Sequence, residues 1–214
     1  MKDTFKHKGL RKILVNEIRA KGIKDENVLK AIEAVPRHFF MDSSFLEFAY
    51  QDKPFPIGSG QTISQPYTVA FQTELLEVKK GDKILEIGTG SGYQACVLIE
   101  MGARVYTVER IKSLYSKTKS LLAQMNYFPK VFYGDGYKGL PAYAPYDKIL
   151  VTAAAPFVPD ALLDQLKPGG FLIIPVGEDD TQKMQKISKT SEGKIDVKNC
   201  GYFRFVPMLN NRIL

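Results

Sequence analysis

Apolar residues recur at helical spacing in the first third of the chain. Between Leu10 and Ile18 they fall three, four and eight positions apart, on one face of a helix that should end at Gly22. Asp25 is expected to cap a second helix, which ends before Pro36. The pattern therefore predicts two amphipathic helices, each with one apolar face to pack against the rest of the protein.

Short apolar runs alternate with amphipathic segments from residue 83 onwards. The runs predict strands over residues 83–88, 104–109, 131–134, 148–153 and 171–176. Strands separated by helices of roughly 10–15 residues form βαβ units and a parallel sheet. A turn at 190–193 predicts a C-terminal hairpin, and a final strand is expected near 202–206. The sequence thus predicts a three-layer α/β architecture with a helical N-terminal cap and a C-terminal β segment.

The segment 51–66 shows neither period. It holds three prolines and two glycines, which predicts a long loop, and long loops in compact domains are usually functional. Pro66 is suited to the first position of the helix that follows. From local chemistry alone, Ser64 is therefore interpreted as the cap of that helix or as a loop residue.

Composition restricts the function classes. The 30 basic and 23 acidic residues give a net charge of +7, which invites a nucleic-acid hypothesis. The positive residues are dispersed, so ordinary solvated faces are the better interpretation, and we expect no stable nucleic-acid partner. We also expect no secretory signal and no membrane span, because no apolar run approaches about 18 residues. Two cysteines exclude a disulfide framework, and no metal site is expected.

A glycine-rich stretch, LEIGTGSGY at 85–93, follows a predicted strand and opens a predicted helix. Gly88, Gly90 and Gly92 permit backbone conformations and close approaches that a Cβ atom would block. Their spacing is G-x-G-x-G, whereas the dinucleotide fingerprint is G-x-G-x-x-G. Glu86 is expected to place negative charge beside this loop. A cationic ligand without phosphates suits such a site better than a pyrophosphate.

Two acidic residues follow the next two predicted strands. Glu109 lies about 20 residues after the first glycine, the spacing of an acid that accepts hydrogen bonds from ribose hydroxyls. Asp135, followed by Gly136, ends the third strand at the same edge and is suited to an adenine amine. With Thr89 and Ser91 of the glycine loop, these residues predict a site for S-adenosylmethionine, whose demethylated product is S-adenosyl-L-homocysteine.

Five segments together resemble the protein-L-isoaspartate (D-aspartate) O-methyltransferase family. The resemblance runs from about Leu10 to Val206, and the GQTISQP stretch is highly specific to that family. The segments are VPRHFF (35–40), PIGSGQTISQPYTVA (56–70), LEIGTGSGY (85–93), VTAAAPFVPDALLDQLKPGG (151–170) and FRFVP (203–207). After Pro207 the tail MLNNRIL departs from the family pattern.

The resemblance implies a Rossmann-like, S-adenosylmethionine-dependent methyltransferase. Such enzymes transfer a methyl group to the α-carboxylate of L-isoaspartyl residues and to the side-chain carboxylate of D-aspartyl residues in damaged proteins and peptides. The family's active-site serine falls on Ser64, and the backbone of Thr62 and Ile63 is expected beside the cofactor. A C-terminal strand at 205–207 is expected to help hold the peptide. The expected peptide-binding residues are Ile57, Gly58 and Val206.

This assignment also fixes the expected organisation. Residues 1–214 are expected to form one domain, with a cap and acceptor loop over 1–80, a cofactor-binding core over 81–178 and a β segment over 179–214. A cytoplasmic location is expected and a monomer is favoured. His7 and His38 lie outside the predicted cofactor and acceptor motifs and are expected to be surface or packing residues, and Cys96 is expected to be a buried packing residue.

Other functions are weighed against this one. A nucleic-acid or small-molecule methyltransferase is the first alternative, but the fourth strand ends in the apolar run 153–157, without the polar acceptor that base-amine methylation calls for. A nicotinamide oxidoreductase conflicts with the glycine spacing. A non-catalytic peptide-binding module conflicts with the intact glycine loop and the two acids.

Overall fold

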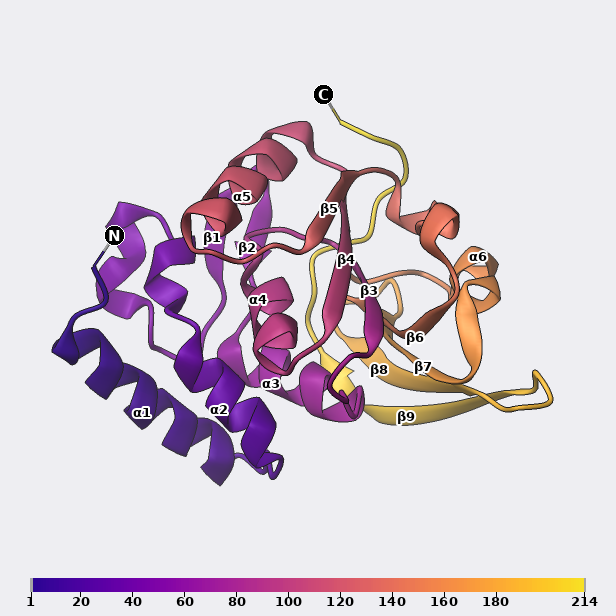
Figure 1. Cartoon of the computed structure of the whole chain (residues 1–214), viewed down its shortest axis with the longest axis horizontal. Coiled ribbons are helices and arrows are strands. Elements are labelled where there is room, and N and C mark those ends of the chain that lie inside the picture. Colours follow the sequence, from indigo (N-terminus) through magenta and orange to yellow (C-terminus); the bar gives the residue numbers. More distant parts are fainter. Residues whose placement is uncertain (1, 214) are drawn as a thin grey trace.

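The computed structural model describes residues 2–213, and its centre is a seven-stranded sheet (Figure 1). The strand order is β5-β4-β3-β6-β7-β8-β9. The first five of these are parallel, and β8 and β9 continue the sheet as antiparallel strands. The strands are β3 (Lys83–Ile87), β4 (Arg104–Glu109), β5 (Lys130–Tyr133), β6 (Tyr146–Val151), β7 (Leu166–Val176), β8 (Gln182–Lys189) and β9 (Ile195–Phe203).

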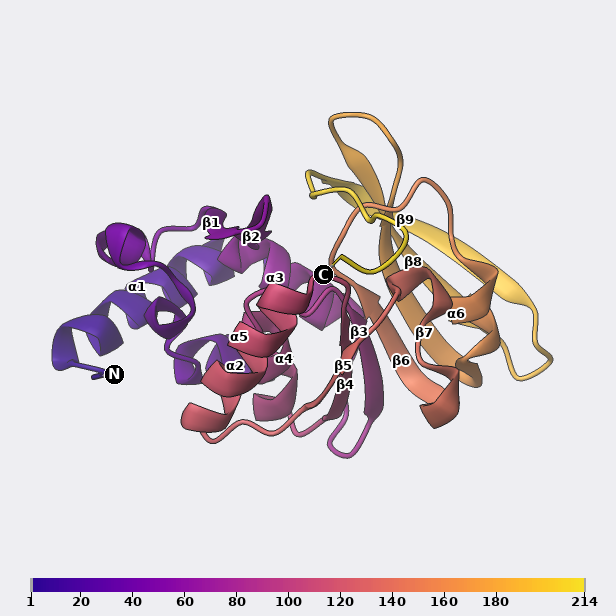
Figure 2. The ribbon, with the colours of Figure 1, turned by 90° about the horizontal axis from the view of Figure 1, so that it is seen from above.

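Helices cover both faces of this sheet. Figure 2 shows α4 and α5 next to the N-terminal helices on one side and α6 on the other side. The helices are α1 (Phe5–Ala20), α2 (Glu26–Ala34), α3 (Pro66–Leu75), α4 (Tyr93–Glu100), α5 (Lys112–Gln124) and α6 (Asp160–Asp164). The predicted three-layer α/β architecture is confirmed. Among the described residues, every helix is too short or too polar to cross a membrane.

The sheet is stable because its central strands are apolar on both faces. On β3, the side chains of Ile84 and Leu85 are both fully buried, in separate apolar clusters. On β6, Leu150 packs in the cluster of Ile84, and Ile149 packs in the cluster of Leu85. Continuous apolar runs of this kind are typical of parallel strands that are covered on both sides. The two faces fix the register of β3 and hence the position of its carboxyl end.

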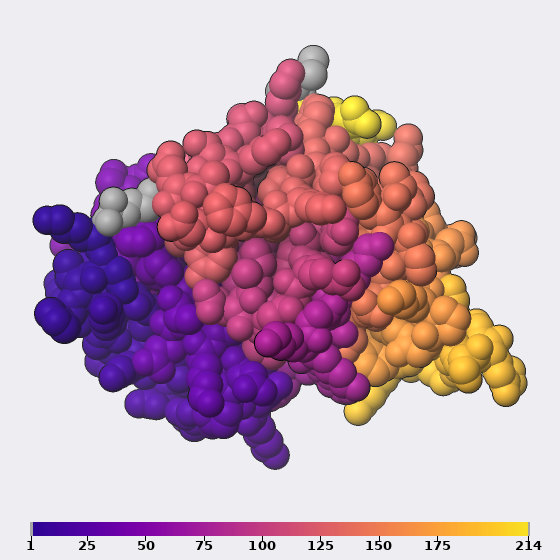
Figure 3. Space-filling model, viewed as in Figure 1, coloured from indigo at the N-terminus to yellow at the C-terminus, as the bar shows by residue number. Residues whose placement is uncertain are grey.

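The helical cap forms as the sequence predicts. Asp25 caps α2 by accepting a hydrogen bond from the backbone N–H of Asn27, and α2 ends at Ala34, before Pro36. Figure 3 shows this indigo part of the chain at the opposite side of the molecule from the yellow C-terminal hairpin. The turn predicted at 190–193 does join β8 and β9. The expected boundary between the cofactor-binding core and the C-terminal β segment, at residue 178, lies in the connection between β7 and β8. This division of the chain stays a prediction.

The prediction that 51–66 forms a loop without secondary structure is wrong. The segment contains a two-stranded antiparallel hairpin, β1 (Phe55–Gly58) and β2 (Gln61–Ile63). Gly58, Ser59 and Gly60 all have positive φ angles, 95°, 53° and 67°, which close the turn between the strands. Periodicity missed the hairpin because strands of four and three residues are too short to show it.

The expected C-terminal strand at 205–207 is also wrong. β9 ends at Phe203, and Pro207 has no N–H with which to extend a ladder. Instead, Val206 accepts a hydrogen bond from Ala154 N at 2.8 Å, and Met208 N donates to Ala154 O at 2.6 Å. These two bonds hold the tail across the carboxyl end of β6.

One buried carboxylate connects the cap to the segment that carries Ser64. Asp52 is 9% exposed and accepts hydrogen bonds from Lys21 at the end of α1 and from Gln65 Nε2. Its Oδ1 also accepts from Tyr67 N at 2.7 Å, in the first turn of α3. The N-cap of α3 is Gln65, whose side chain makes no capping bond. Asp52 therefore supplies the N-terminal acceptor of α3 from another part of the chain.

Replacing Asp52 with alanine is expected to lower the free energy of unfolding by about 1–3 kcal/mol, because the half-buried donors Gln65 Nε2 and Tyr67 N lose their acceptor. Urea unfolding followed by circular dichroism measures this change. Asp196→Ala, on the exposed part of β9, is the matched control and should unfold like the wild type. Equal unfolding midpoints for the two variants would show that Asp52 does not anchor the segment.

Candidate active site

A pocket lies at the carboxyl ends of β3, β4 and β6. This is the edge at which open parallel sheets bind their ligands. Four parts of the chain that are distant in sequence line it. They are the β2 segment at 61–64, the glycine loop with the end of β3 at 87–91, the end of β4 at 108–111, and the tail at 206–209; Val69, Tyr93, Gln94, Gly136, Thr152 and Ala153 complete the wall.

Two glycines give this wall its shape. A Cβ atom on Gly88, whose φ is +98°, would lie 2.5 Å from Thr152 Oγ1. A Cβ on Gly136 would lie 2.5 Å from Ile87 Cγ2. Thr152 donates to the carbonyl of Gly88 at 2.8 Å, so the start of the loop is fixed against the end of β6. Glycine is therefore required at both positions by close packing within the wall, where any Cβ atom would clash.

The carboxylate of Glu109 fixes the glycine loop from the neighbouring strand. Glu109 is buried in the pocket wall, its Oε2 accepts from Gly90 N at 2.9 Å, and its Oε1 accepts from Ile111 N at 2.9 Å. Each carboxylate oxygen can still accept a second hydrogen bond. The group is thus held rigidly while it keeps the acceptor capacity that a ribose diol requires.

Asp135 is placed differently from Gly136, its partner in the prediction. Gly136 lines the pocket, whereas Asp135 is not part of the wall. The Asp135 side chain accepts from Tyr137 N at 3.0 Å and from Asn211 N at 3.3 Å, so it caps the short 3₁₀ helix Gly136–Lys138 and contacts the tail. Its role as an adenine acceptor stays a prediction.

Glu86 lies behind the pocket wall and is fully buried. Burial, with a smaller contribution from the nearby Glu109, raises the pKa of its carboxyl group to about 8, although a hydrogen bond from Thr107 opposes this shift. This shift favours the neutral acid over the negative charge expected beside the loop. The role of Glu86 as a cofactor-binding residue stays a prediction.

Ser64 lies in the pocket wall with Thr62 and Ile63. Of the two local interpretations of Ser64, the helix cap is wrong, because Gln65 occupies that position, and the loop residue is confirmed, because Ser64 lies in the connection between β2 and α3. Among the expected peptide-binding residues, the structure brings Val206 into the same pocket, on the tail. Ile57 and Gly58 belong to the adjacent hairpin and are not part of the wall.

The sequence did not identify several pocket residues. The missed residues are Gln61, Val69, Ile87, Tyr93, Gln94, Val108, Arg110, Ile111, Thr152, Ala153, Pro207, Met208 and Leu209. A strand-end rule applied to β6 would have found Thr152, as it found Glu109 on β4. The tail residues enter because Ala154, Tyr137 and Arg110 bind the tail, and no local pattern signals these contacts.

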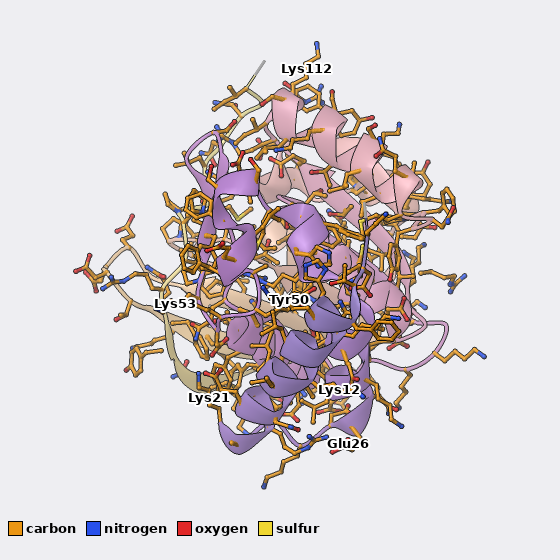
Figure 4. All side chains as sticks on the ribbon, turned by 90° about the vertical axis from the view of Figure 1, so that its left-hand side faces the viewer. Lys12, Lys21, Glu26, Tyr50, Lys53 and Lys112 are labelled. Atoms are coloured by element: carbon orange, nitrogen blue, oxygen red, sulfur yellow. The ribbon has the colours of Figure 1, made fainter. Side chains whose placement is uncertain are left out.

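A second titratable cluster lies in the helical cap. Asp3, His7 and His38 have potential metal-ligating atoms within 4.8 Å of one another. Arg11, however, donates to both oxygens of Asp3 at 2.7 Å and to Tyr50, so the carboxylate already has a cationic partner. Figure 4 looks onto this cap, with Tyr50 near its centre. Burial lowers the pKa of His38, which favours a neutral, packed imidazole over a cation.

Solved structures share this architecture over almost the whole chain. A protein-L-isoaspartate O-methyltransferase matches with a TM-score of 0.84 and 29% identity, over 94% of this chain and 66% of the other. A Plasmodium falciparum protein described as a protein-L-isoaspartate O-methyltransferase, solved with S-adenosyl-L-homocysteine, matches with a TM-score of 0.81 and 28% identity. That match covers 96% of this chain and 99% of the other. The fold and the pocket define the class: this is an S-adenosylmethionine-dependent methyltransferase.

Sequence comparison identifies the family. The chain is 60% identical to the protein-L-isoaspartate O-methyltransferase of Christiangramia forsetii, over 99% of this chain and 100% of the relative. It is 59% identical to the enzyme of the same name from Flavobacterium johnsoniae, with the same coverage. The sequence profile of the protein-L-isoaspartate(D-aspartate) O-methyltransferase family matches residues 9–213. The chain belongs to this family, so the resemblance inferred from its motifs is confirmed.

Replacing Glu109 with alanine is expected to weaken S-adenosyl-L-homocysteine binding by at least tenfold. The variant loses the ribose acceptor and also frees the N–H groups of Gly90 and Ile111, and hydrogen bonds to a charged group contribute about 1.5–3 kcal/mol each. Isothermal titration calorimetry measures the dissociation constant. Glu192→Gln, in the exposed β8–β9 turn, is the control. Unchanged affinity in the alanine variant would remove Glu109 from the cofactor site.

Proposed function

We propose that this chain repairs damaged proteins by methylating the α-carboxylate of L-isoaspartyl residues and the side-chain carboxylate of D-aspartyl residues. The observation that carries this proposal is the shared pocket of Ser64 and Glu109. Ser64 comes from the family-specific GQTISQP segment and Glu109 from the cofactor edge of the sheet. Acceptor and donor groups can therefore meet in one cavity.

The residues present fit S-adenosylmethionine. Glu109 keeps free acceptor capacity for ribose hydroxyls, and glycine at 88 and 136 lets the pocket wall pack tightly against Thr152 and Ile87, where a Cβ would clash. Thr89, Gly90 and Ser91 of the glycine loop line the same pocket. When bound, the cofactor supplies an electrophilic methyl group on a positively charged sulfur.

The acceptor needs orientation rather than a general base. A carboxyl group with an ordinary pKa near ~4 is already ionised at neutral pH, so no proton has to be removed. We assign the Ser64 hydroxyl to orient this carboxylate by hydrogen bonding. Val206 lines the same pocket and would contact the peptide, whereas Thr62 and Ile63 line it as the residues expected beside the cofactor. Holding the acceptor in line accounts for much of the rate enhancement in such transfers.

Esterification explains how methylation leads to repair. It removes the charge of the carboxylate and turns its oxygen into a better leaving group. The neighbouring backbone nitrogen then closes a succinimide without further help from the enzyme, and hydrolysis returns part of it to normal aspartate. Repeated cycles convert the damaged residue.

The same proposal includes a monomer that acts in the cytoplasm without a stable nucleic-acid partner. Both cysteines are free thiols, which is typical of proteins in reducing compartments.

Matched peptides that differ only in one linkage test this function. With radiolabelled S-adenosylmethionine, the peptide with an L-isoaspartyl residue should accept label, and its twin with normal aspartate should remain unlabelled. Both carboxylates are ionised and exposed in such peptides, so only positioning separates them. Labelling of both twins alike, or of neither, contradicts the proposed function.

A further inference from the structure

Glu86 is a carboxyl group sealed behind the wall of the cofactor pocket. Its Oε2 accepts a hydrogen bond from Thr107 Oγ1 at 2.6 Å, whereas its buried Oε1 has no hydrogen-bond partner within residues 2–213. An ionised carboxylate is costly in such surroundings. Because burial raises the pKa of Glu86 to about 8, the group is a neutral acid near pH 7 in the ligand-free protein.

A short chain of hydroxyl groups joins Glu86 to the pocket. Thr107 Oγ1 lies 2.7 Å from Thr89 Oγ1, and Thr89 is part of the pocket wall. Ile87 and Gly88, which follow Glu86 directly, are also part of that wall. Glu86 thus lies directly behind the part of the wall formed by Ile87, Gly88 and Thr89, and its full burial leaves little water to screen an electrostatic interaction with the pocket.

The titratable groups near Glu86, Glu109 and Cys96, do not stabilise its charged form. Glu109, from β4, is itself acidic and raises the pKa of Glu86. Cys96, from α4, is a buried thiol whose own pKa is raised by burial and by Glu86. A positive charge brought into the pocket would lower the pKa of Glu86, because an opposite charge nearby favours ionisation of an acid.

The proposed methyl transfer changes the charge of the cofactor in the pocket at every turnover. The carbon–sulfur bond breaks, sulfur keeps the electron pair, and a carbon–oxygen bond forms on the acceptor carboxylate. The positive sulfonium becomes a neutral thioether and the carboxylate becomes a neutral ester, so the transfer itself neither releases nor consumes a proton. Substrate and product cofactors are therefore almost identical in shape and differ by one positive charge.

We propose that Glu86 is a charge-sensing positioning residue, which releases its proton to solvent when the sulfonium cofactor occupies the pocket and regains a proton from solvent when the thioether remains. Ionised Glu86 then attracts the substrate cofactor but not its product. This selectivity limits inhibition by S-adenosyl-L-homocysteine. The inference rests on the proposed function only for the identity of the cofactor, and it does not depend on which carboxylate is methylated.

Calorimetric proton counting tests this inference. S-Adenosylmethionine and S-adenosyl-L-homocysteine are each titrated into the protein at pH 7 in phosphate and in Tris, whose ionisation enthalpies differ. We expect proton release, approaching one per site, for the sulfonium and none for the thioether. In Glu86→Gln we expect no release for either ligand. The affinity ratio of sulfonium over thioether should fall about tenfold, the factor for one pKa unit. Glu100→Gln, an exposed acid at the end of α4, is the matched control.

Equal proton release for the two ligands in the wild type, or release that persists in Glu86→Gln, would overturn the inference and leave the proposed function intact. Failure of the wild type to bind either ligand would instead count against the proposed function. The calorimetric comparison within the wild type needs no variant, so it stands even if Glu86→Gln folds poorly.

The ligand-free protein gives an independent readout. Folding raises the pKa of Glu86 from its ordinary value of 4.5 to about 8, so the folded state keeps a proton that the unfolded state releases between these values. The stability contributed by protonated Glu86 is fully present below pH 4.5 and is lost as the pH rises through about 8. The melting temperature of the wild type should therefore fall relative to that of Glu86→Gln between pH 5 and pH 8. A difference that is constant over this range would overturn the inference.

Discussion

The site depends on the hydrogen bonds by which Glu109 binds two backbone N–H groups. Through Gly90 this carboxylate fixes the glycine loop that follows β3, and through Ile111 it fixes the start of the segment after β4. β3 and β4 are neighbouring parallel strands in register, so their carboxyl ends meet where a single side chain can reach both connections. The bonds that hold the loop therefore also hold the acid that faces the pocket.

The helical cap completes the site from the opposite side. Asp52 ties the end of α1, Gln65 and the first turn of α3 together, and Ser64 is the neighbour of Gln65. The acceptor serine is thus positioned by buried polar contacts, whereas the cofactor loop is positioned by the sheet. Two separate parts of the fold have to be in place before donor and acceptor can meet.

Periodicity predicted the fold where elements are long and one face is buried. The parallel strands and helices from β3 to β6, and α1 and α2, follow from apolar spacing and from caps such as Asp25. The hairpin β1–β2 was missed because its strands are short, and the tail was misjudged because Ala154 holds it through contacts distant in sequence. Tertiary contacts, not local propensity, decide both segments.

The residues of the candidate site, like the elements of the fold, could be predicted only where their signal is local in sequence. Strand ends identified Glu109, and family motifs identified Ser64, because both kinds of signal are local in sequence. Two properties were not local. The neutral state of Glu86 follows from burial that only the packed sheet creates, and Asp135 binds the tail through Asn211, a contact that no spacing indicates.

A crystal structure with S-adenosyl-L-homocysteine and an L-isoaspartyl peptide tests the central claim most directly. It should show the ribose hydroxyls within hydrogen-bond distance of Glu109, and the peptide carboxylate beside the Ser64 hydroxyl and facing the cofactor sulfur. A nucleoside bound at another edge of the sheet, or a carboxylate out of reach of Ser64, would contradict the account.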